Sequence, residues 1–279
     1  MHAVTAWLKS ADPDIACLQE IKTMDDSFPW LELEALGYNV VTYGQKSYNG
    51  VAILSKLPLE DIRRGLPGQD LLEGLEEDQA RYIEACVSTE KGSVRVASIY
   101  LPNGNPVGDI SEDSPKYMYK LDWMKRLKDH AASLLTLEEP LILAGDYNVI
   151  PRPEDTHDAK AWWGDALFRQ DTLDAFHALR HLGLYDLFDL FDGRGGQYTF
   201  WDYQRGAWQN NEGIRIDHLL CSAQAIDCAK TIQIDKHTRD GEKPSDHVPV
   251  IGTFEFWLWN LKPKNTLTPI NEIWKSGTL

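Results

Sequence analysis

Two short polar runs, each beside an apolar segment, constrain this chain more than any other feature. Gly145-Asp146-Tyr147-Asn148 follows the apolar segment 140–144, and Ser245-Asp246-His247 precedes the apolar segment 248–251. Carboxylate, amide and imidazole groups at the ends of buried strands cost free energy unless polar or charged partners meet them. If both strands belong to one core, these groups converge at its rim. A rim with several carboxylates and one histidine has the groups that metal-assisted hydrolysis uses.

The composition is that of an ordinary globular protein. The chain has 279 residues, of which 43% are hydrophobic and 25% are charged, a balance typical of folded domains. We expect residues 1–260 to form a single domain, and residues 261–279, which are polar and interrupted by proline, to form a C-terminal tail. Many short strands with a few helices between them indicate two packed sheets flanked by helices.

The sequence carries no sign of a membrane or secreted protein. It has no run of about 18 apolar residues, so we expect no contact with a membrane, and residues 1–8 lack the basic and apolar regions of a secretory signal. The four cysteines (Cys17, Cys86, Cys221 and Cys228) are widely spaced without a C-x-x-C pair. This spacing is typical of small buried residues in a reducing compartment. We therefore expect a cytoplasmic monomer.

The net charge leaves the choice of partner open. A value of −15 argues against a polyanionic partner such as DNA, but it says nothing about how the charges are distributed. A divalent cation would also offset a local acidic cluster. Basic stretches occur at 116–120, 125–128 and 236–243. Such stretches are more often solvated faces than nucleic-acid contacts.

Each polar run also has an ordinary structural explanation. Asp146 and Asn148 lie two positions apart, so they face the same side if the strand continues. The same spacing also suits a simple Asx turn. Asp246 and His247 could equally serve as a helix cap or a loop ion pair. The runs therefore indicate a site only in combination with other residues.

Further polar residues near strand ends could complete the site. Glu20 ends a short apolar strand, although a glutamate on the surface is common there. Asp217 lies within an otherwise apolar strand, where a carboxylate is costly without a partner. His247 is its natural partner, because a carboxylate fixes the tautomer and orientation of an imidazole. Tyr100 and Asn103 offer neutral donors to an anionic oxygen, and each is ordinary on its own.

The chemistry of these groups fits phosphate-ester cleavage. Glu20 and Asp246 are hard oxygen ligands that suit Mg²⁺ or Mn²⁺ rather than zinc. Asp146 can orient or deprotonate a water molecule, and Asn148 can hold that water or a phosphate oxygen. His247 can donate to a phosphoryl oxygen and stabilise charge in the transition state.

Six stretches of the chain resemble the exonuclease III / AP endonuclease family, which lies within the endonuclease–exonuclease–phosphatase superfamily. In chain order they are Leu18-Gln19-Glu20-Ile21-Lys22, Tyr48-Asn49-Gly50-Val51-Ala52-Ile53-Leu54-Ser55, Tyr100-Leu101-Pro102-Asn103-Gly104, Gly145-Asp146-Tyr147-Asn148-Val149, Arg215-Ile216-Asp217 and Ser245-Asp246-His247. Together they are specific, and the resemblance covers roughly residues 1–256. The loop 151–163 and the segment 198–203 resemble the bacterial branch.

This resemblance implies a fold, a reaction and a substrate. The fold is α/β, a four-layered αββα sandwich of two mostly antiparallel sheets flanked by helices. The reaction is phosphodiester hydrolysis that depends on Mg²⁺, or on Mn²⁺. The substrate is double-stranded DNA with abasic sites or blocked 3′ ends. Such a DNA-repair enzyme acts as a 3′→5′ exonuclease and incises 5′ to abasic sites.

The resemblance also implies residue roles, position by position. The implied catalytic residues are Asp146, His247, Asp217, Tyr100 and Asn148. The implied metal ligands are Glu20, Asp246, Asp146 and Asn148. The implied contacts with DNA or phosphate are Asn103, Asn49, Phe200 and Trp201. The last two would line a pocket for a flipped-out abasic sugar, and core packing is the alternative for both.

One expectation concerns the start of the chain. Family members usually begin with a strand carrying a Trp-Asn pair, whose Asn helps to hold the metal, whereas this sequence begins within the helix that follows. We therefore expect this N-terminal strand to be lacking. Either the sequence starts downstream of the true start, or the protein has no such strand. Two other functions stay open: a related phosphoesterase acting on RNA or a small phosphate ester, and a catalytically weakened DNA-binding protein.

Overall fold

The computed structural model describes residues 2–68, 79–89, 91–107, 114–241 and 244–256. The tail predicted at residues 261–279 lies outside the described residues, so the predicted domain boundary stays a prediction. Within the described ranges, no helix combines the length and the apolar character that crossing a membrane requires.

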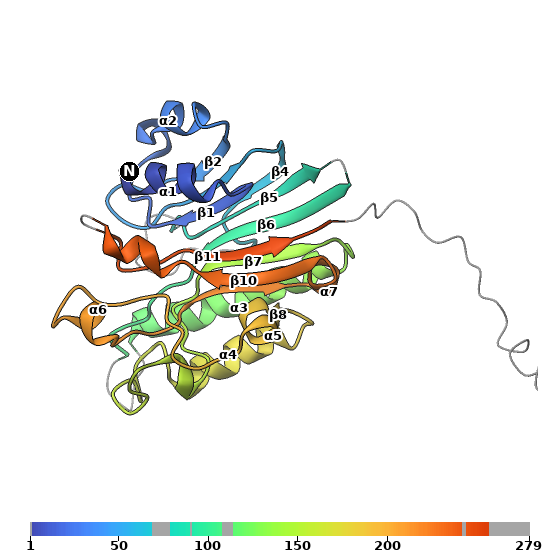
Figure 1. The fold of residues 1–279 in the computed structure, drawn as a ribbon. Coiled ribbons are helices and arrows are strands. Elements are labelled where there is room, and N and C mark those ends of the chain that lie inside the picture. The colour runs from blue at the N-terminus through green and yellow to red at the C-terminus, as the bar shows by residue number, and fades with distance from the viewer. Residues whose placement is uncertain (1, 69–78, 90, 108–113, 242–243, 257–279) are drawn as a thin grey trace, which may run out of the picture.

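Two layers of β-sheet pack face to face, with helices outside each layer (Figure 1). One layer is a six-stranded sheet in the order β4 (Leu59–Arg64), β5 (Tyr82–Thr89), β6 (Gly92–Tyr100), β7 (Leu141–Asp146), β9 (Asp217–Cys221) and β8 (Tyr185–Asp186). The other layer holds a three-stranded sheet, β1 (Ile15–Gln19), β3 (Val51–Ser55) and β2 (Asn39–Tyr43), and a two-stranded sheet, β10 (Ala229–Ile234) and β11 (Val250–Phe254). Neighbouring strands are antiparallel except β6 and β7, which are parallel. The predicted αββα sandwich is confirmed.

Helices cover the outer face of each layer. The longer ones are α1 (His2–Ala11), α3 (Pro115–Leu135) and α4 (Gln170–Arg180), and the shorter ones are α2 (Trp30–Glu34), α5 (Leu187–Phe191), α6 (Ala207–Asn210) and α7 (Ala223–Ile226). Single 3₁₀ turns lie at Asp25–Ser27, Pro153–Asp155 and Lys236–Asp240. α1 and α2 pack on the three-stranded sheet, and α3 and α4 pack on the six-stranded sheet.

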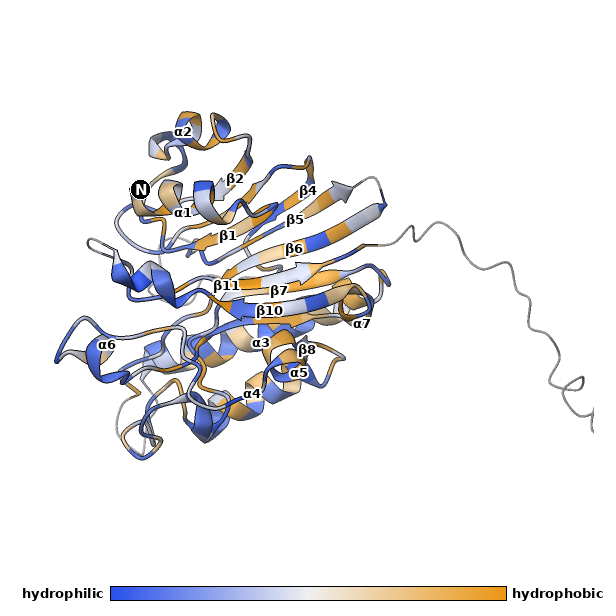
Figure 2. Cartoon of the chain, viewed as in Figure 1, coloured by the Kyte–Doolittle hydropathy of each residue, from blue (hydrophilic) through white to orange (hydrophobic). Residues whose placement is uncertain are grey.

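The sequence of α3 explains both its start and its buried face. Ser114 caps the helix, with its hydroxyl accepting the backbone N–H of Tyr117, and proline occupies the first turn. Trp123, Leu127 and Ala131 recur every four residues and are buried against the six-stranded sheet. Figure 2 shows hydrophilic and hydrophobic residues alternating along α3 and α4, as expected for helices with one covered face.

The layer of two small sheets is divided. β1 packs over both β6 and β7 of the facing sheet, whereas β11 packs over β9. Among the described residues, β1 pairs only with β3 and β11 only with β10. Ala144, in the central strand β7, is half-buried. Apolar residues from both small sheets nevertheless join one core against the six-stranded sheet.

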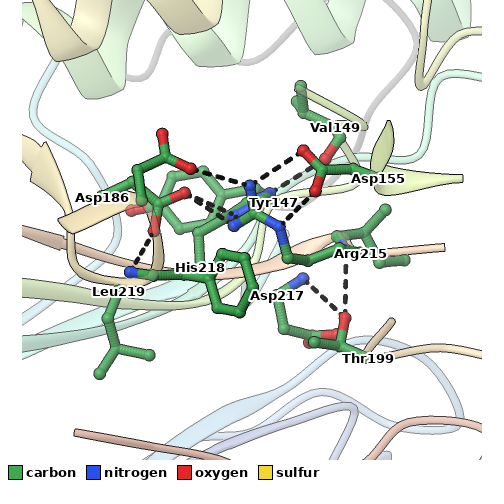
Figure 3. A network of polar contacts seen from close by, with 12 residues as sticks. Tyr147, Val149, Asp155, Asp186, Thr199, Arg215, Asp217, His218 and Leu219 are labelled. Atoms are coloured by element: carbon green, nitrogen blue, oxygen red, sulfur yellow. Dashed lines mark hydrogen bonds and ion pairs between the residues drawn. The ribbon is translucent and has the colours of Figure 1, made fainter. Parts of the chain in front are cut away.

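A buried ion cluster ties the loop after β7 to the start of β9 (Figure 3). The guanidinium of Arg215 donates two hydrogen bonds to the carboxylate of Asp155, at 2.9 and 3.0 Å, and a third to Asp186 Oδ2 at 2.7 Å. All three side chains are buried. Although burial alone would raise it, the guanidinium of Arg215 holds the pKa of Asp186 far below its usual range.

His218 extends the cluster to the chain beside the site. Its Nε2 lies 3.0 Å from the carbonyl oxygen of Val149, and its Nδ1 lies 3.0 Å from Nη1 of Arg215. Because a carbonyl only accepts and a guanidinium only donates, the ring donates through Nε2 and accepts through Nδ1. Arg215, two residues before Asp217, and His218, directly after it, are therefore anchored, and so is Val149, which follows Asn148.

We expect Arg215→Met to lower the free energy of unfolding by about 3–5 kcal/mol, because it leaves Asp155 and Asp186 buried without their counter-charge. Denaturant unfolding followed by circular dichroism measures the change. Arg194→Met is the matched control, since Arg194 pairs with Asp192 at the surface, and we expect no measurable change from it. Equal stability of the two variants would contradict a structural role for the cluster.

Candidate active site

Three predicted site residues lie side by side at one edge of the six-stranded sheet. Tyr100 ends β6, Asp146 ends β7 and Asp217 begins β9. In the strand register, Tyr100 lies beside Asp146, and Asp146 lies opposite Asp217. This follows from strand direction: parallel strands end at the same edge, whereas an antiparallel strand begins where its neighbour ends. Residues that are 117 positions apart by number, from 100 to 217, thus become neighbours.

His247 lies between the two carboxylates. Its Nδ1 is 2.9 Å from Asp217 Oδ2, and its Nε2 is 4.0 Å from Asp146 Oδ2. The predicted pairing of Asp217 with His247 is therefore present, and the Nδ1–H donates to the carboxylate. The ring of Phe200 packs edge-on against the imidazole, with ring centroids 5.0 Å apart. The imidazole keeps 27% of its surface exposed, so a substrate can reach it.

The electrostatics of this group favour a protonated imidazole. Burial lowers the pKa of His247, but the carboxylates of Asp217, Asp146 and Asp246 together outweigh burial and raise the pKa to about 10. Burial raises the pKa of Asp146, and Asp217 and Glu20 add to this against the opposing effect of His247. A carboxylate with a raised pKa is a better base than a solvated one.

Asn148 locks the carboxylate of Asp146 in place. Its backbone N–H donates to Asp146 Oδ1 at 2.8 Å, and its amide Nδ2 donates to Asp146 Oδ2 at 3.1 Å. The amide Oδ1 of Asn148 accepts a hydrogen bond from Asn103 at 3.0 Å. The first of these bonds is an Asx turn, so the ordinary alternative and the predicted site coexist. Asn148 has φ of 47°, a left-handed conformation that asparagine tolerates better than most residues.

Glu20 lies immediately after β1 and faces Tyr100. The hydroxyl of Tyr100 donates to Glu20 Oε1, and the ammonium of Lys22 lies 2.5 Å from Glu20 Oε2. Burial would raise the pKa of Glu20, but Lys22 and Tyr100 lower it. The pKa of Lys22 is raised, mainly by its hydrogen bond to Glu20 and further by Asp246. Glu20 and Asp246 therefore act on the same small region of the rim.

The donor set fits magnesium better than zinc. Within the part of the chain that the structure describes, no three or more His, Cys, Asp or Glu side chains cluster tightly enough to enclose a metal ion. Structural zinc needs such a closed set. Mg²⁺ commonly uses one or two protein carboxylates and completes its shell with water and substrate oxygens. Glu20 and Asp246 are carboxylates of the kind that such a shell uses.

The remaining predicted residues divide into two groups. Asn103 is exposed and contacts Asn148, and Phe200 is half-buried beside His247. Asn49 is buried, and its amide donates to Gln45 Oε1 at 2.9 Å. For Trp201 the sequence left a pocket wall and core packing open, and its side chain, which is 0% exposed, matches core packing in this structure.

The packing around Trp201 gives the reason. Its indole N–H donates to Asn211 Oδ1 at 3.2 Å, and its ring meets Trp208 edge-on at 4.8 Å. Successive residues of an extended segment point to opposite faces. Phe200 therefore faces the site, whereas Trp201 faces the interior.

Two residues gain a place near the site that the sequence did not assign. The hydroxyl of Thr199 accepts the backbone N–H of Asp217 at 3.2 Å, which orients the start of β9. Lys120 is fully buried on α3, and its ammonium donates to the carbonyl oxygens of Asn103 and Asn148. Burial outweighs the attraction of Asp146 and Asp165 and lowers the pKa of Lys120 to about 7.

A signal for Lys120 was present in the sequence. It lies four residues before Met124 and seven before Leu127, on the buried face of the helix. A lysine within an apolar helical stripe needs a buried hydrogen-bond partner. Grouping Lys120 with Lys116 in the basic stretch 116–120 instead suggests a solvated face.

Known proteins resemble this chain over most of its length. The family model described as the endonuclease/exonuclease/phosphatase family matches residues 1–247. Exodeoxyribonuclease III of Haemophilus influenzae is 32% identical over 262 residues, which cover 91% of this chain and 94% of the relative. Exodeoxyribonuclease of Bacillus subtilis is 29% identical over 88% of this chain and 89% of the relative.

Solved structures share the fold. The 3′ phosphatase NExo from Neisseria, bound to a product DNA hairpin, has a TM-score of 0.82 and 35% identity, covering 90% of this chain and 93% of that one. An AP endonuclease from Archaeoglobus fulgidus has a TM-score of 0.82 and 33% identity, covering 91% of this chain and 93% of that one. The family predicted from the motifs is thus confirmed, and this chain belongs to the endonuclease/exonuclease/phosphatase family.

Proposed function

We propose that this protein is a Mg²⁺-dependent DNA-repair phosphodiesterase of the exonuclease III type. It would remove nucleotides from 3′ ends of duplex DNA and incise 5′ to abasic sites. The observation that carries the proposal is the row Asp146–His247–Asp217, in which an imidazole contacts one carboxylate at 2.9 Å and faces a second at 4.0 Å. A base and a proton donor thus sit next to each other at an accessible edge.

The proposed chemistry assigns different tasks to the two carboxylates. Asp146, held by Asn148, accepts a proton from the water that attacks phosphorus. Asp217 keeps His247 oriented and protonated, so that Nε2 donates to a phosphoryl oxygen as negative charge builds there. The bond between phosphorus and the 3′ oxygen breaks, and the 3′ oxygen leaves with a proton from solvent.

Several residues would hold the substrate and the metal. Tyr100 and Asn103 would donate to phosphate oxygens, and Phe200 would form one wall of the pocket beside His247. Glu20 and Asp246 would hold Mg²⁺, or Mn²⁺, which supplies positive charge near the scissile phosphate when bound.

The substrate class is supported by the relatives. Their names describe an exodeoxyribonuclease, a 3′ phosphatase bound to a product DNA hairpin and an AP endonuclease. Double-stranded DNA with an abasic site or a blocked 3′ end is therefore the substrate we propose. The four cysteines are free thiols, which suits a reducing compartment, and a cytoplasmic monomer remains our prediction.

We expect Asp146→Ala and His247→Ala each to reduce incision of an abasic-site duplex by about 100-fold or more, because each removes a proton-transfer or charge-stabilising group. Gel assays with Mg²⁺, and with EDTA as a blank, measure the rates. Asp171→Ala and His237→Ala are matched controls at exposed positions. Unchanged cleavage by the site variants would refute the assignment. Cleavage of RNA or a small phosphodiester in place of DNA would favour the related phosphoesterase.

Glu20→Gln should raise the Mg²⁺ concentration needed for half-maximal cleavage by about 10-fold or more, since it removes one hard anionic ligand. A Mg²⁺ titration of the cleavage rate measures this. Glu32→Gln, at an exposed position of α2, provides the control. An unchanged Mg²⁺ requirement would exclude Glu20 as a ligand.

The pKa of His247 provides a test that needs no substrate. Asp217→Asn removes the main interaction that raises this pKa, so we expect the imidazole to titrate well below about 10 in the variant. NMR titration of the His247 ring in the presence of EDTA measures both values. The same pKa in both proteins would show that Asp217 does not hold the proton on His247.

This shift also predicts the pH dependence of stability. A pKa raised in the folded state adds stability that is fully present below the ordinary value of 6.5 and is lost as the pH rises toward about 10. The difference in unfolding free energy between the wild type and Asp217→Asn should therefore shrink between these pH values. A difference that grows with pH would have the wrong sign.

A further inference from the structure

Lys120 has an environment that stability alone does not explain. Its side chain is 0% exposed, and its ammonium donates to two backbone carbonyl oxygens, Asn103 O at 3.1 Å and Asn148 O at 2.6 Å. Its described hydrogen bonds include none to a carboxylate, and Asp146 and Asp165 act on it only at longer range. Burial of an ammonium without a directly paired carboxylate is costly. An apolar side chain of similar volume would avoid that cost.

The two carbonyls belong to two different loops of the site. Asn103 follows β6, and Asn148 follows β7. Their side chains are also joined to each other, through the hydrogen bond from Asn103 Nδ2 to Asn148 Oδ1. The ammonium of Lys120 thus holds the backbone of Asn103 and Asn148, the same two residues whose side-chain amides are hydrogen-bonded to each other.

The effect continues to the carboxylate that we propose as the base. Asn148 donates to Asp146 through both its backbone N–H and its amide. Asn148 also has φ of 47°, and its carbonyl points to the buried ammonium. Without that donor, a buried carbonyl oxygen would lack this partner, and the loop would be free to turn it toward water. Any such turn moves both donors that hold Asp146.

The loop after β6 is shaped to the lysine. A Cβ at Gly104 would lie 2.7 Å from Cδ of Lys120, and Gly104 has φ of +90°, a conformation that side chains rarely adopt. The glycine therefore admits both the lysine stem and the turn that presents the carbonyl of Asn103. Loop and lysine fit each other as one unit.

We propose that Lys120 is a positioning residue, which clamps the loops after β6 and β7 from inside the protein and thereby sets the orientation of Asn148 and Asp146. The proposal rests on the proposed function of that site. Lys120 itself does not touch the substrate, because it lies beneath the two loops and has no exposed surface.

The variant Lys120→Met tests this, because it keeps most of the unbranched apolar stem and removes the donor. We expect kcat on an abasic-site duplex to fall about 10- to 100-fold, as for other residues that orient a reacting group. We expect KM for the duplex to change less than about threefold. The melting temperature should change little, because the cost of two carbonyl oxygens without their donor is offset by no longer burying a charged amine. Lys125→Met, at an exposed position on the same helix, should match the wild type in all three.

A second readout does not depend on cleavage. The side-chain amide signals of Asn103 and Asn148 in NMR spectra should shift and exchange faster with water in Lys120→Met, and should be unchanged in Lys125→Met. If Lys120→Met does not fold, Lys120→Gln replaces it, because its amide is polar, carries no charge and, being one atom shorter than lysine, does not reach both carbonyls. The same loss of kcat and the same amide shifts are expected there.

The outcomes separate the two proposals. Unchanged kcat in the folded variant would overturn the role of Lys120, as would a parallel loss of kcat and melting temperature with unshifted amide signals. If the wild type itself does not cleave DNA, the proposed function fails. In that case the amide signals alone decide, and unshifted signals would overturn the clamp.

Discussion

The register of β7 against β9 places two carboxylates, Asp146 and Asp217, directly opposite each other, and much of the surrounding structure depends on this contact. Like charges in facing positions of neighbouring strands repel, and both groups lie at the edge of a hydrophobic sandwich. A cation between them relieves the repulsion. His247 provides it, with Nδ1 on Asp217 and Nε2 toward Asp146. The same contacts that make this edge stable keep the imidazole protonated, so the stabilising charge is also the proposed catalytic one.

Parts of this arrangement could be predicted from single residues, and parts could not. The partnership of Asp217 with His247 follows from the cost of a carboxylate inside an apolar strand, because that cost requires a partner somewhere in the chain. The pairing of Asp146 with Asp217 does not follow in this way. It depends on the strand order β6-β7-β9, which is fixed by packing between segments far apart in the sequence.

Where the sequence left two alternatives open, the direction in which side chains point separates them. Phe200 and Trp201 are adjacent and both aromatic, and composition gives no reason to separate them. The bridges from Phe200 to Ile214 and His247 fix the segment, and the alternation of an extended chain then directs Phe200 to the site and Trp201 inward. Lys120 was overlooked for a related reason. Lysine is usually exposed, so its residue type predicts a solvent-facing side chain. Its position on the apolar face of the helix predicts the opposite, and the contacts in the structure show that position 120 is buried.

Arg215 and Lys120 both link the stability of the fold to the geometry of the proposed site. Each is a buried cation behind a loop of the site, and each holds backbone or carboxylate groups whose displacement would move Asp217 or Asp146. They differ in what offsets the free-energy cost of burying the charge. Asp155 and Asp186 neutralise Arg215, so the fold itself depends on that cluster. Among the described residues, the direct hydrogen-bond partners of Lys120 are backbone carbonyls, and a hydrogen bond to a carbonyl stabilises a buried ammonium less than one to a carboxylate. A chain that needed only a stable core would have an apolar residue at position 120. A lysine there is expected where the geometry of the loops above it matters more than the free energy lost by burying its charge.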